Sequence, residues 1–391
     1  MNKIKCVVCG GNTVNVLRMD RLPITGIYTA SSIAVEQSYD LCLLQCTRCT
    51  HMQLADHIPV EYIYNDTYKH RTSHSGFARR GVAKLIEALD LYNKEYDTNI
   101  YGNVVVDIGC SDGYLLSQLG DRTDRKVGID PVADNNDMDS MHYDVELIKG
   151  FIEDVDIAGI DPDMVVMRHT LEHIDAPYDT IKHISDSMRV GTYMVIQVPC
   201  SELMIEDMRF DHIFHQHLNY FSPKSLGKLL TSAGLLPIYV WWDRYDWGSI
   251  IMLSRKTSDS AVHKADTLNI CDTLYPDQIA RLYDDYHDMM GQIDSIILNT
   301  KDNVVGYGAA QMLPVIAYHM WRGFERITEV VDDDPSKDGM YYSNLPIRIT
   351  NKVPDVMSNT FVITGVDSTR TIYRKLIDME ADRIISLLPV S

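Results

Sequence analysis

Short apolar runs alternate with segments of helical hydrophobic spacing over the middle of the chain. From residue 103, the run "NVVVD" leads through the glycine turn "IGCSDG" into the apolar spacing of "YLLSQL". Three further runs, "KVGID", "DMVVM" and "TYMVIQVP", precede the helical pattern of "SPKSLGKLLTSAG". Strands that alternate with helices build a parallel sheet with helices on both faces. This part of the chain therefore predicts a doubly wound α/β domain.

A smaller version of the same pattern runs from about residue 300 to the end of the sequence. "NVVGYGAAQ" reads as strand, glycine turn and helix start, "ITEVVDDDP" as a strand that ends in acids, and "NTFVITGV" as a third strand. The amphipathic pattern "YPDQIARLYDDYHDMMGQIDSIILN" precedes them and predicts a linking helix. We therefore predict a second, smaller Rossmann-like α/β domain.

The N-terminal region contains two matched C-x2-C pairs, Cys6 with Cys9 and Cys46 with Cys49. Each pair lets one turn present two thiolates, and two such turns complete a tetrahedral zinc site. The alternative is that the four are unrelated reduced cysteines. We predict a structural zinc and three domains: a zinc module over 1–70, a cofactor-binding domain over 71–260, and the linking helix with the C-terminal domain over 261–391.

Length and charge narrow the class of protein. A chain of 391 residues is too long for one ordinary core, and its net charge of −19 argues against nonspecific binding to nucleic acid or anionic lipid. No apolar run reaches membrane-spanning length, and "MNKIKCVVCGG" lacks the apolar core of a signal peptide. We expect a cytoplasmic protein that binds neither nucleic acid nor membranes. The sequence leaves the oligomeric state open.

The glycine turn after residue 106 carries the pattern Asp107-x-Gly109-x-x-x-Gly113. Its glycines would let the backbone approach a nucleoside, but the spacing is not the G-x-G-x-x-G of a pyrophosphate site. Asp130 closes the next strand, where a carboxylate can accept hydrogen bonds from both ribose hydroxyls. Strand, turn, helix, strand and terminal acid together predict a site for S-adenosylmethionine (SAM). A dinucleotide site is the alternative.

Two later segments are rich in histidine. "RHTLEHIDAP" follows a predicted strand, so Glu172 and His173 would lie at the carboxyl edge of the sheet, where ligands bind in open α/β folds. "FDHIFHQHLNYFS" holds His212, His215 and His217. A metal held by these three remains open, although their spacing suits neither one helix face nor one strand face. The other interpretation is that one histidine acts and the rest are structural, with His217 as the active one.

The order of these motifs resembles that of a known family. The paired C-x2-C knuckles, "DIGCSDG", "LEHI", "FDHIFHQH", "GYGAAQ" and "VVDDDPSKDG" follow one another as in the three-domain zinc-binding, SAM-dependent sugar C-methyltransferases. The resemblance covers nearly the whole chain. It implies methyl transfer from SAM to a carbon of a nucleotide-linked deoxyketosugar, with the C-terminal domain helping to hold the sugar nucleotide. The turn Tyr307-Gly308-Ala309 would then be a close-approach site for that substrate.

The same resemblance implies roles for individual residues. The family's Tyr-x-Glu-His segment corresponds to Phe214-His215-Gln216-His217, so His217 matches the proposed base, while Gln216 replaces a glutamate and Phe214 a tyrosine. His173 matches a second active-site histidine. A tyrosine after the knuckles also lines the family's site. Tyr64 is the best match for it, with Tyr62 and Tyr68 as alternatives.

The expected chemistry suits these residue types. A carbon next to a ketone can lose a proton to a histidine, whose pKa lies near neutrality, and can then attack the SAM methyl. Gln216 can orient a neighbour but cannot carry charge as a glutamate does. Methylation of a hydroxyl or amine on a related sugar nucleotide therefore stays open. So does a non-catalytic protein that binds SAM and uses its zinc module for interaction.

Overall fold

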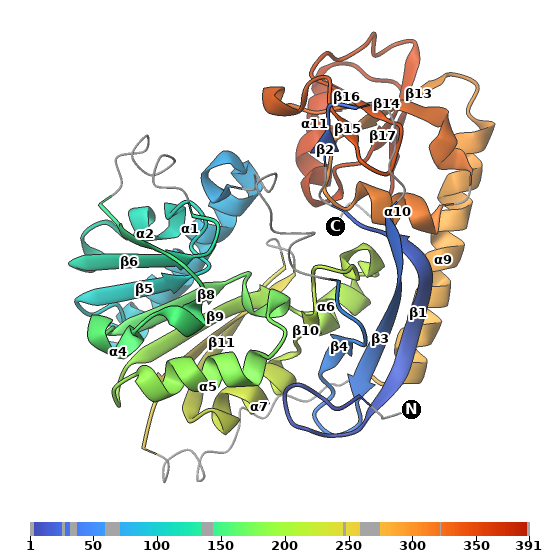
Figure 1. Cartoon of the computed structure of the whole chain (residues 1–391). Helices are drawn as coiled ribbons and strands as arrows, with labels where there is room; N and C mark the ends of the chain where they lie inside the picture. The colour runs from blue at the N-terminus through green and yellow to red at the C-terminus, as the bar shows by residue number, and fades with distance from the viewer. Residues whose placement is uncertain are drawn as a thin grey trace. The chain divides into compact units, whose positions relative to one another are not determined.

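The computed structural model divides into two compact units that interrupt one another along the chain (Figure 1). The structure describes residues 4–25, 28–31, 37–58, 71–133, 144–244, 248–258, 274–320 and 322–388. The first unit comprises Met1–Val16, Leu43–Asp207 and Gln216–Pro276. The second unit comprises Leu17–Cys42, Met208–His215 and Asp277–Ser391.

A seven-stranded sheet forms the centre of the first unit, in the order β11-β12-β9-β8-β5-β6-β7. The strands β7, β6, β5, β8 and β9 run parallel, and β12 and β11 are antiparallel at one edge. The bounds are β5 Val104–Ile108, β6 Arg125–Asp130, β7 Glu146–Lys149, β8 Met164–Arg168, β9 Tyr193–Pro199, β11 Leu235–Asp243 and β12 Ser249–Lys256. The parallel part confirms the predicted doubly wound domain, whereas the antiparallel pair was not predicted.

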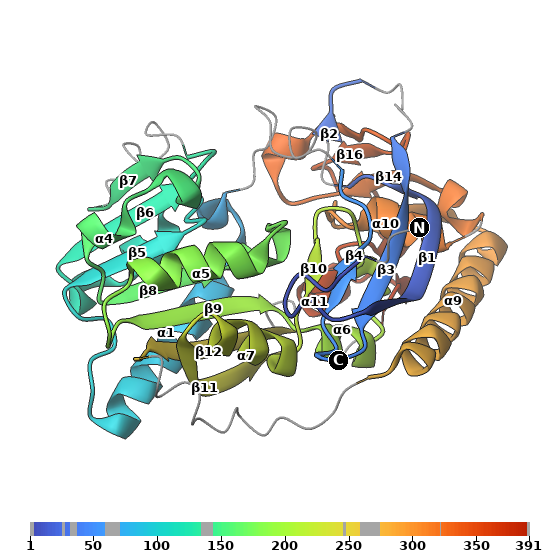
Figure 2. The ribbon, with the colours of Figure 1, turned by 60° about the horizontal axis from the view of Figure 1, so that its bottom comes forward.

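Helices cover both faces of this sheet (Figure 2). Alternate residues of a strand point to opposite faces. Val105 accordingly packs with Val82 and Leu85 of α1, and Val106 packs in the separate cluster that contains Ile181 of α5. The helices are α1 Gly76–Tyr96, α2 Tyr114–Gln118, α4 Ile157–Ile160, α5 Pro177–Ser187, α6 Ser201–Glu206 and α7 Pro223–Ser232.

A four-stranded sheet, β1-β3-β4-β10, carries the cysteine-rich region. Its strands are β1 Thr13–Pro23, β3 Ser38–Cys46, β4 Met52–Leu54 and β10 Asn219–Tyr220. β4 pairs antiparallel with β3 and, on its other side, with β10, where Asn219 lies opposite Gln53. The segment just after His217 is therefore hydrogen-bonded into the same sheet as the cysteine region.

The second unit contains another seven-stranded sheet, in the order β18-β17-β13-β14-β16-β15-β2. Five strands are parallel, and β15 and β2 are antiparallel at one edge. The bounds are β2 Tyr28–Thr29, β13 Asn303–Tyr307, β14 Ile327–Val331, β15 Tyr341–Tyr342, β16 Arg348–Thr350, β17 Asn359–Ile363 and β18 Ile384–Ser386, with α9 Pro276–Asn299, α10 Leu313–His319 and α11 Thr369–Asp378. This sheet agrees with the predicted Rossmann-like domain, and its last strand comes from the N-terminal region.

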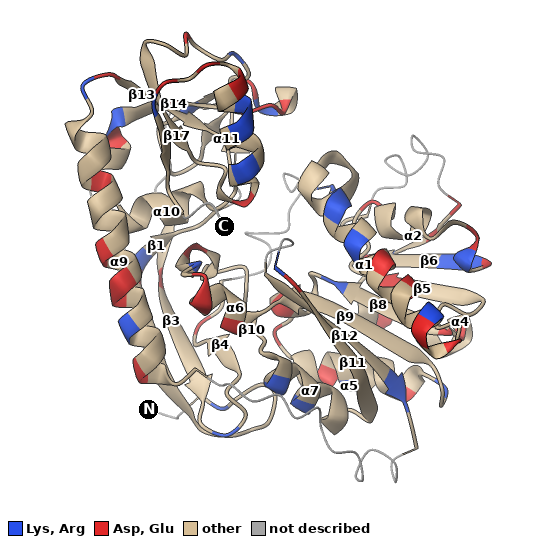
Figure 3. Ribbon diagram, turned by 180° about the vertical axis from the view of Figure 1, so that it is seen from behind, with Lys and Arg blue, Asp and Glu red and all other residues tan. Residues whose placement is uncertain are grey.

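Short 3-10 helices connect several of these elements. They are η2 Thr72–His74, η3 Gly120–Arg122, η4 Ile152–Asp154, η5 Leu171–His173, η6 Phe210–His212, η7 Gly323–Arg326, η8 Pro335–Lys337 and η9 Val366–Ser368. Figure 3 shows acidic residues, in red, spaced along the ribbon of α9, in keeping with the negative net charge. Among the described residues, every helix is too short or too polar to cross a lipid bilayer.

The predicted domains are continuous, with bounds at 1–70, 71–260 and 261–391, whereas the compact units are not. Residues 17–42 pack with the second unit, although they lie inside the predicted zinc module. Packing alone does not define which segments fold independently, so the three predicted bounds stay a prediction.

Candidate functional site

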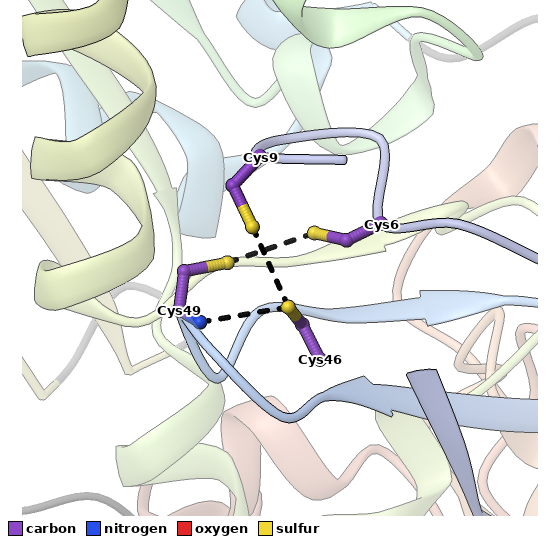
Figure 4. Close-up of side chains that lie close together, drawn as sticks. All are labelled: Cys6, Cys9, Cys46 and Cys49. Carbon is purple, nitrogen blue, oxygen red and sulfur yellow. Dashed lines mark hydrogen bonds between the residues drawn. The ribbon is translucent and has the colours of Figure 1, made fainter. Parts of the chain in front are cut away.

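The four cysteines of the two C-x2-C pairs converge in the first unit (Figure 4). The Sγ atoms of Cys6 and Cys49 are 3.6 Å apart, and those of Cys9 and Cys46 are 3.5 Å apart. A tetrahedral zinc with Zn–S bonds of about 2.3 Å requires sulfur–sulfur distances of roughly 3.8 Å. The observed distances therefore fit a four-cysteine zinc ion and are far too long for disulfides.

The turns that carry the four cysteines are suited to holding a zinc ion. Backbone N–H groups of Arg48 and Cys49 point at the sulfur of Cys46, at 3.4 and 3.5 Å. Gly11 lies so close to the cluster that a Cβ atom there would be 2.9 Å from the Cys46 sulfur. The contact between the two sulfurs holds the pKa of Cys6 below its usual range and raises the pKa of Cys49. Four packed thiols cannot all ionise together unless a cation balances their charge, which is what zinc would supply.

The glycine turn after β5 is formed by residues in the left-handed region. Gly109, Ser111 and Gly113 have φ angles of 76°, 55° and 72°. The N–H of Gly109 donates to the carbonyl of Ile129, 2.8 Å away, which ties the turn to β6. A Cβ atom on Gly109 would lie 2.1 Å from Oγ1 of Thr170. Glycine is therefore required here both for its backbone conformation and for this contact.

Asp130 ends β6 beside this turn, as predicted. Its Oδ2 atom accepts from the N–H of Ser111 and its Oδ1 from that of Val132, each at 2.9 Å. These two bonds orient the carboxylate while each oxygen keeps a lone pair for a ligand hydroxyl. The arrangement fits a nucleoside ribose at the end of β6.

The side chain of Asp107 is buried near the end of β5. Burial raises its pKa to about 8, and its Oδ1 atom has no hydrogen-bond partner among the described residues. A buried carboxyl group of this kind is neutral near pH 7 and can donate one hydrogen bond. Because Oδ1 of Asp107 has no hydrogen-bond partner among the described residues, the turn fits a ligand that brings a polar group.

The segment after β8 joins this turn to the histidines. Thr170, which packs against Gly109, is followed directly by η5, and η5 ends at His173. Nδ1 of His173 is 2.7 Å from the backbone carbonyl of Gln216, and the rings of His173 and His217 have centroids 4.9 Å apart. Because a carbonyl only accepts, Nδ1 of His173 carries the proton. The two predicted histidines, His173 and His217, thus lie together. His173 is three positions after Thr170, which packs against the glycine turn.

His217 is buried and held by its neighbours on both sides. The Gln216 carbonyl accepts from His173, and the Leu218 N–H donates to the backbone carbonyl of Glu172 at 2.8 Å. β10 then begins at Asn219. One ligand atom each from Glu172, His173 and His217 lie within 4.8 Å of one another. Glu172 was predicted to lie at the carboxyl edge of the sheet but not to have a role there, although its place in "LEHI" beside His173 was a signal.

The other two histidines of "FDHIFHQH" belong to the second unit. His212 lies against Arg209, whose Nη2 atom is 2.7 Å from Asp367. Nε2 of His215 donates to the carbonyl of Tyr39 at 3.1 Å. In the part of the chain that the structure describes, neither falls in a group of metal-ligand atoms. Their contacts are those of structural side chains.

The predicted turn of the C-terminal domain lies at the end of β13. Gly308 has a φ of 97°, and a Cβ atom there would be 2.5 Å from the Cα of Gly365. The Tyr307 hydroxyl donates to Asp333, and the Ala309 N–H donates to Asp332. The approach of Gly365 is enough to require glycine at 308, so the substrate role of Tyr307, Gly308 and Ala309 stays a prediction. Tyr64, Tyr62 and Tyr68 lie outside the described residues.

Comparisons with known proteins agree with this arrangement. Residues 6–64 match a family described as "Putative zinc binding domain", and residues 76–239 match one described as "Methyltransferase domain". The chain is 25% identical over 258 residues to the C-methyltransferase NovU of Streptomyces niveus, a match that covers 64% of this chain and 60% of that protein. The chain thus spans about three fifths of the length of this relative.

Solved structures with a similar fold include other methyltransferases. The N-methyltransferase NodS from Bradyrhizobium japonicum, in complex with S-adenosyl-L-homocysteine, is 12% identical, with 51% of this chain and 96% of that chain covered and a TM-score of 0.37. A putative methyltransferase in complex with the Trm112 activator of Haloferax volcanii is 16% identical, with 40% and 84% covered and a TM-score of 0.34.

The two family matches and the similarity to NovU confirm the resemblance predicted from the sequence. The zinc-binding family covers all four clustered cysteines, and the methyltransferase family covers the glycine turn, Asp130 and His173. SAM and a structural zinc are accordingly the cofactors of the two matched domains. The chain contains a zinc-binding domain followed by a methyltransferase domain, and it is similar to a C-methyltransferase.

Proposed function

We propose that the protein transfers the methyl group of SAM to a carbon next to the ketone of a nucleotide-linked sugar. One observation carries the proposal: His173, whose ring lies against that of His217, is three residues beyond Thr170, and the Thr170 side chain packs against Gly109 of the glycine turn. A base is thereby held close to the turn that would bind the methyl donor. The similarity to a C-methyltransferase supports carbon as the acceptor.

The chain's own residues would divide the work as follows. Asp130 binds the ribose hydroxyls, and Gly109 lets the nucleoside approach the backbone. When bound, SAM supplies a methyl group on a positively charged sulfur. His217 takes a proton from the carbon beside the substrate ketone, and the electron pair of that C–H bond passes into the enolate. The carbon would then take up this methyl group, and the sulfur would keep the electron pair of the broken sulfur–methyl bond.

His173 positions this base. Its Nδ1–H is bound to the Gln216 carbonyl, so its Nε2 atom is the acceptor in the neutral ring. A fixed tautomer next to His217 favours one direction of proton movement. The same bond holds the peptide of Gln216, and with it the backbone immediately before the base.

The zinc module supports the methyltransferase domain in this proposal. Cys6 and Cys46 belong to the same hydrophobic cluster as Val106 and Ile196, from the central strands of the sheet. The zinc site is thus continuous with one face of the methyltransferase core. We assign the ion a structural role, because all four tetrahedral positions are taken by cysteine.

A second candidate function is methyl transfer to a hydroxyl of a similar sugar nucleotide. The observation that favours it is Phe214, which is buried and has no hydroxyl where the resembling family has a tyrosine. His217 would then remove a proton from oxygen. The non-catalytic alternative predicts SAM binding without turnover.

The test is an incubation with methyl-labelled SAM and a panel of nucleotide-linked 4-ketosugars. We expect label on a ring carbon with the wild-type protein and none with His217→Ala. His183→Ala is the matched control, because His183 is an exposed histidine on α5 of the same unit. Label on oxygen would contradict the carbanion route. Exchange of a ring C–H with deuterium would support that route. SAM binding without transfer to any sugar in the panel would contradict the proposal.

A further inference from the structure

Glu172 is a buried carboxylate surrounded by histidines. Its side chain is almost completely buried, and its Oε2 atom has no hydrogen-bond partner among the described residues. Its Oε1 atom is 3.3 Å from Nδ1 of His169. One carboxylate oxygen also lies within 4.8 Å of ring nitrogens of both His173 and His217. Three imidazoles thus lie near one carboxylate in the first unit.

Such a carboxylate is costly unless a positive charge balances it. Removing an ionised carboxylate from water without a partner costs several kcal/mol, and a nearby opposite charge offsets this cost. Each neighbouring histidine becomes positively charged when it accepts a proton. A proton that arrives on one of these rings is therefore stabilised by Glu172.

The backbone holds His217 in reach of this carboxylate. The Leu218 N–H donates to the Glu172 carbonyl at 2.8 Å, and His173 donates to the Gln216 carbonyl at 2.7 Å. These two bonds connect η5 to Gln216 and Leu218, the residues on either side of His217. Rotation of the His217 backbone away from Glu172 would break both of them.

We propose that Glu172 is a positioning residue whose carboxylate orients His217 and stabilises the imidazolium that forms when His217 takes the substrate proton. This inference rests on the proposed function. It supplies from η5 the negative charge that Gln216 cannot carry. The arrangement is that of a carboxylate behind a histidine base, in which the carboxylate fixes the ring and never itself takes the proton.

Other polar groups around the pair bear on its titration. His169 shares the Glu172 carboxylate, and His173 adds a second ring. From β10, the Tyr220 ring lies 6.3 Å from that of His217. The neighbouring strand β9 contributes Gln197, whose Oε1 atom accepts from the charged Arg168 and whose backbone carbonyl accepts from the N–H of His169. Among these described neighbours, Glu172 is the one carboxylate close to His217. Its removal should therefore change the pKa of His217 directly.

The experiment follows the histidine signals of the full-length, ¹⁵N-histidine-labelled, zinc-loaded protein by NMR across pH 5 to 9. Spectra of His217→Asn assign the His217 signal. We expect Glu172→Gln to lower the pKa of His217 by about 1, because an opposite charge at close range is lost. Glu153→Gln, the same substitution in η4 of the same unit, should leave it unchanged. An unchanged His217 pKa in folded Glu172→Gln would overturn the proposal.

A second variant and a metal titration keep the test decisive. Glu172→Asp retains the charge on a shorter side chain, so it should give an intermediate pKa for His217 even if the glutamine variant does not fold. Addition of Mn²⁺ should leave the His173 and His217 signals unbroadened. Selective broadening at micromolar Mn²⁺ would show that the three residues form a metal site, which would overturn the proposal.

These measurements need no substrate, so failure of the proposed function is visible separately as the absence of methyl transfer. If transfer is observed, Glu172→Gln should lower kcat roughly tenfold, because a weaker base removes the proton less readily. It should also move the acid limb of the kcat/KM profile to lower pH. A loss of activity with an unmoved limb would indicate a merely structural role.

Discussion

The four-cysteine cluster and the cluster of Glu172, His173 and His217 are built on opposite principles. Each cysteine comes with a partner three positions away, so two local turns deliver the whole set. The histidine cluster instead joins η5 to a segment 43 positions further along the chain. The first set is chemically uniform and suits one ion, whereas the second mixes a carboxylate with two imidazoles. In our proposal, the cysteine cluster stabilises the fold and the histidine cluster transfers a proton.

Of the changes that distinguish the cysteine cluster from the histidine cluster, removal of zinc is expected to have the largest effect. Because the cysteines share a hydrophobic cluster with the central strands, we expect Cys49→Ser to destabilise the first unit by several kcal/mol. Thermal unfolding with measured zinc content checks this expectation. Cys42→Ser, a cysteine outside the cluster, should retain full zinc and the wild-type melting temperature. Equal stability of zinc-free and zinc-loaded protein would contradict the structural role.

Replacement of the base should do the opposite, with little change in the fold and a large change in rate. We expect His217→Ala to reduce methyl transfer by about 10²–10⁴-fold, the usual contribution of a general base. The melting temperature and SAM affinity should stay close to wild type. A mutant that loses SAM binding and activity together would instead make His217 a structural residue of the sheet edge.

A substitution in the glycine turn is expected to have a smaller effect, on the affinity for SAM. Gly109→Ala places a Cβ atom 2.1 Å from Thr170 Oγ1 at a positive φ, so we expect SAM affinity by calorimetry to fall at least about tenfold. Gly120→Ala is the matched control, because Gly120 also has a positive φ but has open space around it. If both variants bind SAM equally, contact with Thr170 does not shape the turn.

Asp107 should produce the smallest effect, visible only as a pH dependence. Its folded pKa of about 8 lies above the value of about 4 for an unfolded aspartate. The folded state therefore holds the proton more tightly, and its contribution to stability is lost as pH rises from about 4 to 8. Asp107→Asn should remove this loss and be more stable than wild type at pH 8. Urea unfolding at pH 5 and pH 8 compares the two, and parallel pH profiles would contradict the expectation.

Much of the fold was predictable because its signals are local. Buried runs between helical patterns identified both parallel sheets, and Gly109 with Asp130 marked the cofactor edge. The edge strands were not predictable. β2 has two residues and pairs with β15, and β11 and β12 carry no period that distinguishes antiparallel from parallel pairing. Edge strands depend on partners far along the chain, which hydrophobic periodicity does not encode.

Residue spacing identified the features that act over a few residues: the C-x2-C pairs, the glycine turn, the acid after β6 and the candidate histidines. The packing of distant segments showed which of these histidines lie together. It assigns His212 and His215 to contacts with Arg209 and Tyr39, and it brings His217 to His173. It also buries Glu172 beside them. The physical reason is that spacing constrains neighbours along one turn, whereas burial and contacts between distant segments exist only once the sheets have packed.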